Sequence, residues 1–213
     1  KSELELRQQT ELIELSEQGD IINQSLLSAE NTLKGLKQFA EYQLENPEDL
    51  NVAIPKLVQS GDRFHLLAQP RNVFSQGRRL QSNITGIGSV ENLRPDLHLE
   101  IKMAQALTPA FVAGSANNED ATWFYYLSNN NFVSIYPWIS HNAWQFSPQM
   151  LGNPYYRDIL KSNMDSDAFI WSHPFKDTAG KGVKASIGTG VKFAGDLLGA
   201  LVIDVDLASL KDK

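Results

Sequence analysis

The sequence predicts an α+β domain in which a long N-terminal helix and a helical base are followed by a five-stranded antiparallel sheet with flanking helices. Apolar residues recur at helical spacing through the first fifty residues, and aromatic and β-branched runs separated by turn residues appear only after residue 120. The length of 213 residues suits one domain with a helical appendage. We therefore divide the chain into residues 1–50, 51–120 and 121–213.

The composition indicates a folded chain and argues against several partners. Apolar residues make up 42% and charged residues 21%, which is ordinary for globular proteins. Nineteen basic against 25 acidic residues give a net charge of −6 with no basic stripe, and duplex nucleic acid requires such a stripe. The chain has no cysteine, which excludes disulfides, thiolate metal sites and thiol catalysis. We expect no nucleic-acid partner.

Membrane-spanning and targeting patterns are not evident. The apolar run at residues 197–203 is much shorter than the ~20 residues that span a bilayer, and no segment has the pattern of a signal peptide. The first residue is Lys1 and not methionine. We interpret the chain as a soluble piece excised from a longer protein.

The N-terminal segment shows a heptad-like apolar seam. Its members follow one another at alternating spacings of three and four: Leu12, Leu15, Gly19, Ile22, Leu26, Ala29, Leu33, Leu36 and Ala40. A helix over residues 12–40 would be roughly 40 Å long, and Asn46-Pro47 should end it, because the residue before proline disfavours helical geometry. The seam packs either against its own domain or against the same helix of a second subunit; the pattern leaves both open.

Residues 51–120 are expected to be helical and irregular. Pro55 could occupy the first turn of a helix. A second helix should follow Pro95 and be kinked or ended by Pro109. Its apolar face would carry Leu97, Ile101, Ala104 and Leu107.

The sheet is predicted from residue 121 onward. Residues 123–127 and 132–136 flank Ser-Asn-Asn-Asn, and asparagine tolerates left-handed turn geometry, so they should form a hairpin. Further strands are expected at 169–175, 183–193 and 197–207, with a short helix at 155–162. We expect the helices to cover one face of this sheet.

No motif indicates catalysis or metal binding. The chain lacks a G-x-S-x-G elbow, a Walker loop and an H-E-x-x-H helix. The glycine pairs at 86/88 and 188/190 lack the third glycine of a dinucleotide site, and the four histidines have no ligand spacing. We expect no enzyme, metal or cofactor, and a small hydrolase is the least favoured alternative.

Aromatic and acidic residues are concentrated in the last third of the chain. Strand alternation places Phe169, Trp171, His173 and Phe175 on one face. Asp204 follows four apolar residues, and a carboxylate there is costly unless it is paired or hydrogen-bonded. Either it points to solvent at a sheet edge or caps a turn, or it closes a pocket and meets a ligand's amine or hydroxyl.

Four segments in order resemble the PDC, or Cache, sensor family. They are Trp-Phe-Tyr-Tyr-Leu-Ser at 123–128, Phe-Val-Ser-Ile-Tyr-Pro-Trp at 132–138, Trp-Ser-His-Pro-Phe-Lys-Asp at 171–177 and Gly-Ala-Leu-Val-Ile-Asp-Val-Asp-Leu at 199–207. The resemblance covers roughly residues 95–210. It implies a PAS-like module in the periplasm, part of an inner-membrane receptor of the diguanylate cyclase or histidine kinase type, with transmembrane helices on both sides.

The resemblance also implies site residues. The strand segment would contribute Phe175 and Asp177, the last strand Asp204, and the helix Tyr155 and Tyr156. Amino-acid-binding members carry Arg-Pro-Trp-Tyr where this chain has Asn-Pro-Tyr-Tyr at 153–156, and Arg157 comes one turn late. This difference argues against amino-acid sensing, and Phe175 stands where tyrosine is more usual.

Together these observations predict a small-molecule site between the sheet and the 155–162 helix. We expect it to contain Tyr136, Trp138, Tyr155, Tyr156, Arg157, Trp171, His173, Phe175, Asp177 and Asp204. The receptor would be a homodimer paired through the N-terminal helix. The alternative is a periplasmic protein-interaction module without a ligand, in which side chains such as Trp171 and Tyr136 fill the pocket.

Overall fold

The computed structural model describes residues 3–50, 55–67, 74–75, 78–79, 81–91, 93–176 and 182–210, with side chains of the first helix from residue 13 onward. The helices are α1 (Glu3–Glu45), α2 (Pro95–Asn117), α3 (Pro154–Ser162) and a short 3-10 helix, η1 (Pro148–Met150). The strands are β1 (Leu57–Ser60), β2 (Arg63–Leu66), β3 (Phe74–Ser75), β4 (Arg78–Arg79), β5 (Asn83–Ile87), β6 (Ala121–Ser128), β7 (Phe132–Tyr136), β8 (Ile170–Trp171), β9 (Phe175–Lys176), β10 (Val183–Phe193) and β11 (Asp196–Asp206). No helix within these residues is both long enough and apolar enough to cross a membrane.

Nine of the described strands form one antiparallel sheet, in the order β1-β2-β5-β7-β6-β11-β10-β8, with β9 also pairing with β10. The five predicted strands are all present, although the third is interrupted and pairs only as β8 and β9. The predicted turns are confirmed by Asn131 (φ 62°) after β6 and by Ala194 (φ 51°) and Gly195 (φ 91°) between β10 and β11.

The expectation of a helical segment at 51–120 is wrong for its first part. Pro55 precedes a strand and not a helix. β1, β2 and β5 add three strands, and the division of the third predicted strand into β8 and β9 brings the sheet to nine. Gly61, with a φ of 62°, forms the turn of the β1–β2 hairpin. The second predicted helix is confirmed as α2, which continues through Pro109.

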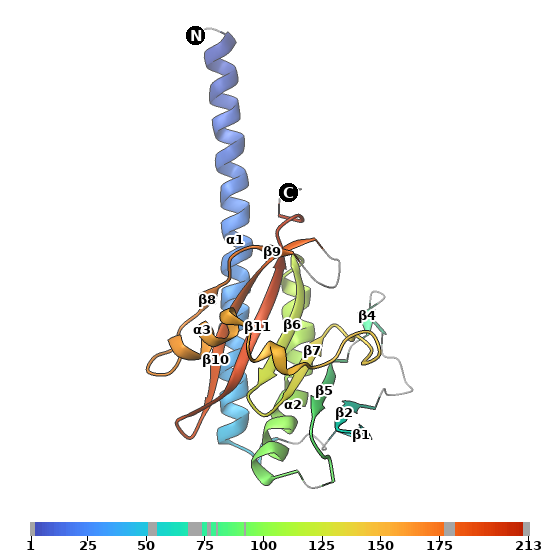
Figure 1. Cartoon of the computed structure of the whole chain (residues 1–213). Coiled ribbons are helices and arrows are strands. Elements are labelled where there is room, and N and C mark those ends of the chain that lie inside the picture. Colours follow the sequence, from blue (N-terminus) through green and yellow to red (C-terminus); the bar gives the residue numbers. More distant parts are fainter. Residues whose placement is uncertain are drawn as a thin grey trace.

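Helices cover both faces of the sheet, which corrects the expectation that they cover one (Figure 1). Successive side chains of a strand point to opposite faces. Leu201 and Ile203 of β11 therefore join the core beneath α1 and α2, whereas Ala200 and Val202 join a second cluster that includes Ile159 of α3.

The C-terminal half of α1 packs against its own domain. Ala29, Leu33, Leu36 and Ala40 of the predicted seam are at most 3% exposed in the main core. The N-terminal half projects beyond the body (Figure 1), and Leu15 of the same seam is 65% exposed. Ile22 and Leu26 of the seam are partly buried against the same core. Own-domain packing is therefore confirmed for the seam from Ile22 onward, and pairing with a second subunit stays a prediction for the part before it.

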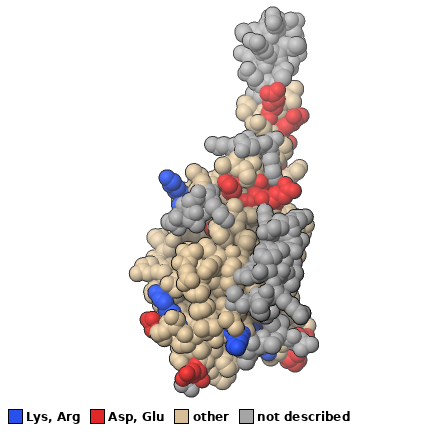
Figure 2. Space-filling model, turned by 90° about the vertical axis from the view of Figure 1, so that its right-hand side faces the viewer, with Lys and Arg blue, Asp and Glu red and all other residues tan. Residues whose placement is uncertain are grey.

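Charges on the surface are unevenly distributed. On the face drawn in Figure 2, lysine and arginine residues lie singly over the body, while acidic residues lie on the projecting part of α1, at the end of the body nearest to it and around the opposite end. Glu14, Glu17 and Asp20 of the projecting part are all exposed.

A buried carboxylate joins α2 to the β6–β7 hairpin. Glu100 is 1% exposed. Its Oε1 accepts hydrogen bonds from the Tyr126 and Ser128 hydroxyls, both at 2.6 Å, and its Oε2 accepts one from Asn130 Nδ2 at 2.7 Å. Burial raises the pKa of this carboxyl, and these hydrogen bonds lower it by less.

Glu100 should make the domain less stable as the pH rises. Because its pKa is raised on folding, the unfolded chain loses the proton first, and the free energy of unfolding falls between the ordinary pKa and the raised one. Glu100→Gln is expected to flatten this decline, as measured by urea unfolding at stepped pH. Glu91→Gln, at an exposed position, should leave the slope unchanged; equal slopes for all three proteins would contradict the assignment.

Candidate functional site

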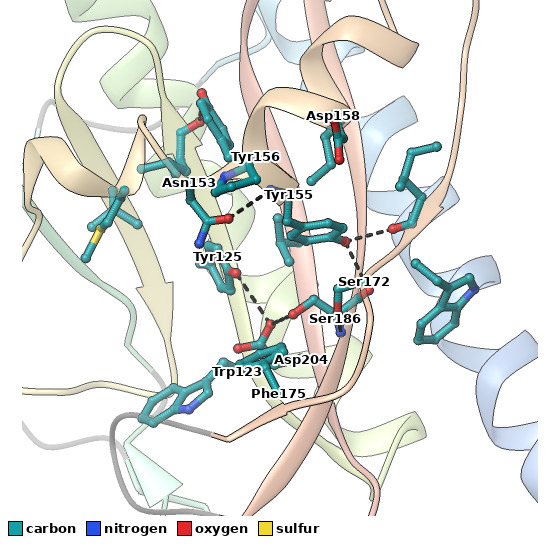
Figure 3. Close-up of a pocket in the computed structure, with 18 of the residues that line it drawn as sticks. Trp123, Tyr125, Asn153, Tyr155, Tyr156, Asp158, Ser172, Phe175, Ser186 and Asp204 are labelled. Atoms are coloured by element: carbon teal, nitrogen blue, oxygen red, sulfur yellow. Dashed lines mark hydrogen bonds between the residues drawn. The ribbon is translucent and has the colours of Figure 1, made fainter.

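A cavity of about 610 Å³ lies between the sheet and α3 (Figure 3). Its floor is the face of the sheet opposite α1 and α2, its cover is α3 with the preceding loop, and its third side is the segment around β8 and β9. The residues lining it are Trp123, Tyr125, Leu127, Val133, Ile135, Ile139, Trp144, Met150, Asn153, Pro154, Tyr155, Tyr156, Asp158, Ile159, residues 170–175, Ser186, Val202 and Asp204.

The register between β6 and β11 builds the floor. Asp204 is opposite Trp123, and Val202 is opposite Tyr125, so these side chains share one face. The intervening Phe124 enters the core beneath α1 and α2. A run of consecutive aromatic residues is thus buried on both faces of the strand, half in the core and half around the cavity.

Asp204 is the acidic group of the floor. It is 8% exposed and lies opposite Ser186 of β10. Its Oδ1 accepts a hydrogen bond of 2.6 Å from Ser186 Oγ and a longer one of 3.4 Å from the Tyr125 hydroxyl (Figure 3). The interpretation in which Asp204 points to solvent is therefore wrong, and its contact with a ligand stays a prediction.

Neutral tyrosine donors surround this carboxylate. Burial, and then the charge of Asp204, raise the pKa of both Tyr125 and Tyr155 above the ordinary tyrosine value. Both phenols therefore remain protonated around neutral pH. The polar part of the floor is a carboxyl group beside hydroxyls that cannot readily ionise.

Tyr155 fastens α3 to the sheet. The side chain of Asn153 caps the helix by accepting a 2.9 Å hydrogen bond from the Tyr155 backbone N–H. The Tyr155 hydroxyl lies 2.7 Å from the Ile170 carbonyl and 3.0 Å from that of Ser186, and can donate to either. Ser172 pairs with Ser186 from the neighbouring segment, donating from its N–H and accepting at its Oγ. These hydrogen bonds hold α3, and the segment that contains Ile170 and Ser172, against β10.

Tyr156 fixes the other side of the helix. It is 4% exposed, and its hydroxyl lies 2.9 Å from Asn129 Oδ1 and 3.2 Å from the Leu127 carbonyl. Burial, followed by the charge of Glu100, raises its pKa. Tyr156 therefore anchors α3 over the β6–β7 hairpin while lining the cavity.

Six of the ten predicted site residues line the cavity. They are Tyr155, Tyr156, Trp171, His173, Phe175 and Asp204. Asp177 lies outside the described residues.

Three predicted residues are elsewhere. Tyr136 is 1% exposed and lies in the core beneath α1 and α2, because the alternation that turns Ile135 toward the cavity turns Tyr136 away. Trp138 packs against that same core. Arg157 is exposed and outside the wall, because the side of α3 carrying Tyr156 and Ile159 faces the sheet.

Several residues of the wall were not predicted. Trp123 and Tyr125 lie two apart in a recognised strand, so alternation places them on one face, but only the pairing with β11 identifies that face as the cavity side. Ser186 is recognised only by its position opposite Asp204. Trp144 comes from the loop before α3, where no periodic pattern exists.

The described residues contain neither of two common catalytic arrangements. Among them, no serine hydroxyl is hydrogen-bonded to a histidine ring, and Ser186 is bonded to a carboxylate instead. Within the described residues, no group of three or more histidine, cysteine, aspartate or glutamate side chains is placed to hold a metal ion.

Comparison with known proteins finds matches only among solved structures: no family model and no curated protein matches the chain. The sensory domain of the Campylobacter jejuni chemoreceptor Tlp3 with isoleucine bound is 14% identical over 95% of this chain and 64% of that one, with a TM-score of 0.41. The ligand-binding domain of the Pseudomonas fluorescens chemoreceptor CtaA with L-leucine is 21% identical over 49% and 43%, with a TM-score of 0.36.

A third solved domain, from the Pseudomonas aeruginosa amino-acid chemoreceptor PctC with GABA, is 21% identical over 44% of this chain and 38% of that one, with a TM-score of 0.33. These structural neighbours are ligand-binding domains of bacterial chemoreceptors. The chain spans less than two thirds of the length of each of the three.

Proposed function

We propose that this chain is the small-molecule-sensing domain of a bacterial membrane receptor, of the diguanylate cyclase or histidine kinase type, and that it is not itself an enzyme. The observation that carries the proposal is the cavity of about 610 Å³. Small-molecule sites are typically clefts of about 300–1,000 Å³ with mostly apolar walls and a few oriented polar groups. The cavity has that size, and its polar groups are concentrated around Asp204 and Ser186.

Hydrogen bonds join α1 to β10, a strand that also lines the cavity. The strand β10 carries Ser186 in the cavity wall and, four residues later, Gly190, whose carbonyl accepts a 2.7 Å hydrogen bond from the buried Lys37 Nζ of α1. Glu41 Oε1 of α1 accepts a 2.9 Å bond from the Lys192 N–H of the same strand. A shift of β10 on ligand binding would therefore move these contacts on α1.

Signalling through this connection requires only a modest coupling free energy. A ligand shifts a receptor only by its differential affinity for two states, and couplings of about 1–3 kcal/mol change an output roughly 5–150-fold. In the proposed receptor, the state that changes is the position of α1 relative to its partner helix.

We place the domain in the periplasm, anchored in the inner membrane by transmembrane helices that flank it. The projecting part of α1 and the end of β11 lie at the same end of the body (Figure 1), which is the arrangement that two such anchors require. The cavity would then face the periplasm, where the ligand is encountered.

A thermal-shift screen of small molecules tests the proposed function, with a pull-down from periplasmic extract run beside it. A ligand at 100 times its Kd stabilises by about 2.7 kcal/mol, which for a domain of this size raises the Tm by roughly 5–10 °C. We expect at least one compound to reach this range. If no compound stabilises the domain and a protein is captured instead, the interaction module without a small-molecule ligand is the better account.

The proposed dimer predicts that Leu15→Glu dissociates it. Leu15 lies in the seam of the projecting half of α1 and is 65% exposed, and a carboxylate in an apolar helix seam is repelled by its symmetry mate. We expect the dimer dissociation constant to rise at least about tenfold, as measured by sedimentation over a concentration series. Ser16→Glu, on the same turn but outside the seam, should have little effect; a dimer indifferent to both changes would contradict pairing through α1.

A further inference from the structure

The loop between β7 and α3, residues 137–153, supplies part of the cavity wall. It ends at the residue whose side chain caps α3. The loop residues that line the cavity are Ile139, Trp144, Met150 and Asn153. The contacts that hold this loop in place therefore also shape the cavity.

Hydrogen bonds of 2.8 Å fix the loop to strands β5 and β2. Asn83 Nδ2 of β5 donates to the Ile139 carbonyl. The Phe146 backbone N–H donates to Thr85 Oγ1 of β5, and the Phe146 carbonyl accepts from Arg63 Nη1 of β2. The position of the loop thus depends on strands at the far edge of the sheet from β10.

A pair of stacked histidines is a further contact between the loop and β2. His65 alternates with Phe64 and Leu66, which enter the core beneath α1 and α2, so its ring lies on the opposite face of the sheet. The rings of His65 and His141 have centroids 3.6 Å apart and planes inclined by 15°. Both side chains are partly buried.

The stack can hold one proton but disfavours a second. Two neutral imidazoles can lie face to face, and one proton on the pair leaves a cation over the face of an uncharged ring. When both rings are protonated, two like charges lie face to face with ring centroids 3.6 Å apart. Each charge then disfavours the other, more strongly where water is partly excluded.

The charged side chains near the stack oppose its protonation. Among the described residues of β1, β2, β5 and the loop, strand alternation places Arg63 on the face that carries His65, and Lys56, just before β1, on the same face of the neighbouring strand. Neither β5 nor the loop contributes a charged residue besides the loop histidine. Asp62 is exposed in the turn between β1 and β2.

Acid should therefore favour release of the loop. Burial, and then the charge of His141, lower the pKa of His65. A His65 ring freed from the stack regains the ordinary histidine pKa of about 6.5, so the released state binds the proton more readily than the docked state. Docking is fully favoured above this pH and loses free energy as the pH falls below it.

We propose that the His65–His141 pair is a pH-sensitive latch, which holds the loop on β2 while at least one ring is uncharged and releases it when both are protonated. Release removes the part of the cavity wall that the loop supplies. Protons and a bound small molecule then act in opposite directions on one docking equilibrium. This inference rests on the proposed sensing function for its consequence and adds a regulation of the same site.

Hydrogen exchange of the Phe146 amide tests the latch without any ligand. This N–H is bonded to Thr85 in the docked loop, so its exchange requires local opening. Rates for the intact domain at about pH 7.5 and about pH 5.5 are divided by the intrinsic rate at each pH, which gives the opening constant. We expect this constant to be at least about fivefold larger at the lower pH.

Variants with an uncharged ring locate the effect. His141→Phe keeps an aromatic ring on His65 but removes one of the two charges, so its opening constant should change by less than about twofold. His98→Phe makes the same substitution in α2 and should respond to pH as the unchanged chain does. If His141→Phe fails to fold, His65→Phe takes its place with the same expectation.

Three results would overturn the latch. They are an opening constant that does not rise in acid, an equal rise in the His141→Phe variant, and a His65 titration midpoint, read from its ring proton resonances in the unchanged chain, at or above the ordinary histidine value. The last measurement decides the matter even if neither ring variant folds.

A second exchange experiment connects the latch to the cavity. The compound that gives the largest Tm rise in the thermal-shift screen is added at about ten times its Kd, and the Phe146 opening constant should fall at least about fivefold at either pH. An unchanged constant would overturn the regulation of the site. If the pH response is as expected but no compound stabilises the domain, the latch stands and the sensing function fails.

Discussion

Replacing Val202 by tryptophan is expected to abolish ligand binding while leaving the domain folded. Val202 is 3% exposed, lies midway along β11 and points into the cavity from the floor. It is opposite Tyr125 on one side and Gly188 on the other. An indole at this position has the empty space of the cavity to enter, so it occupies the ligand's volume without displacing core side chains.

The expected loss of affinity exceeds about 100-fold, because the ligand can no longer bury its apolar body. Isothermal titration with the best stabiliser from the screen measures it, and the unfolding temperature without ligand checks the fold. Val58→Trp makes the same substitution on the half-buried edge strand β1 and should leave binding intact. Undiminished binding to Val202→Trp would mean that the ligand lies elsewhere.

The second large effect is expected from Gly188→Ala. A Cβ added at Gly188 would lie 2.3 Å from Ile159 Cδ1 and 3.0 Å from the Tyr155 hydroxyl oxygen. This glycine therefore allows α3 to approach β10, and a methyl group there must displace the Ile159 side chain and crowd the Tyr155 hydroxyl. We expect a loss of about 1–3 kcal/mol in the free energy of unfolding, together with weaker ligand binding.

Gly35→Ala is the matched control. Nothing lies within 4 Å of a Cβ added at this exposed position in α1, and alanine in a helix interior is better than glycine by roughly 0.5–1 kcal/mol. Chemical denaturation should thus show opposite signs for the two glycine-to-alanine changes. Equal, small effects would contradict the close packing of α3 on β10.

The elements that could be predicted from the sequence are those with local signals. Asn131 and Gly195 have left-handed backbone conformations at the turns that their residue types indicate. Proline at residue 47 follows the end of α1, and Pro95 begins α2. These signals are read within a few residues and do not depend on distant partners.

The strands at the other edge of the sheet could not be predicted because they are short and because β2 and β5 pair with partners distant in the sequence. β1 and β2 have only four residues each, and β5 pairs with β7, whose residues are about fifty positions later in the chain. Pro55 is compatible with the start of a helix or of a strand. Short segments without clear periodicity are decided by the sheet that accepts them.

A site residue could be predicted where burial of its charged group has a clear free-energy cost. Asp204 was singled out because a carboxylate in an apolar strand requires partners, and Ser186 and Tyr125 provide them. The pattern left its direction open, and only the resemblance assigned it to the pocket. Tyr136 was misplaced because strand β7 is buried on both faces, so that the sequence does not show which face borders the cavity. The faces are assigned only by the register between strands.

The four tryptophans of the chain allow the central claim, that this cavity holds the ligand, to be tested in one spectrum. Trp123, Trp144 and Trp171 line the cavity, whereas Trp138 packs against the core on the other side of the sheet. Indole N–H resonances of ¹⁵N-labelled domain are recorded while the strongest stabiliser from the screen is added. We predict that the three cavity resonances shift with a common dissociation constant and that Trp138 changes least. A saturating ligand that shifts Trp138 alone, or none of the other three, would contradict the account.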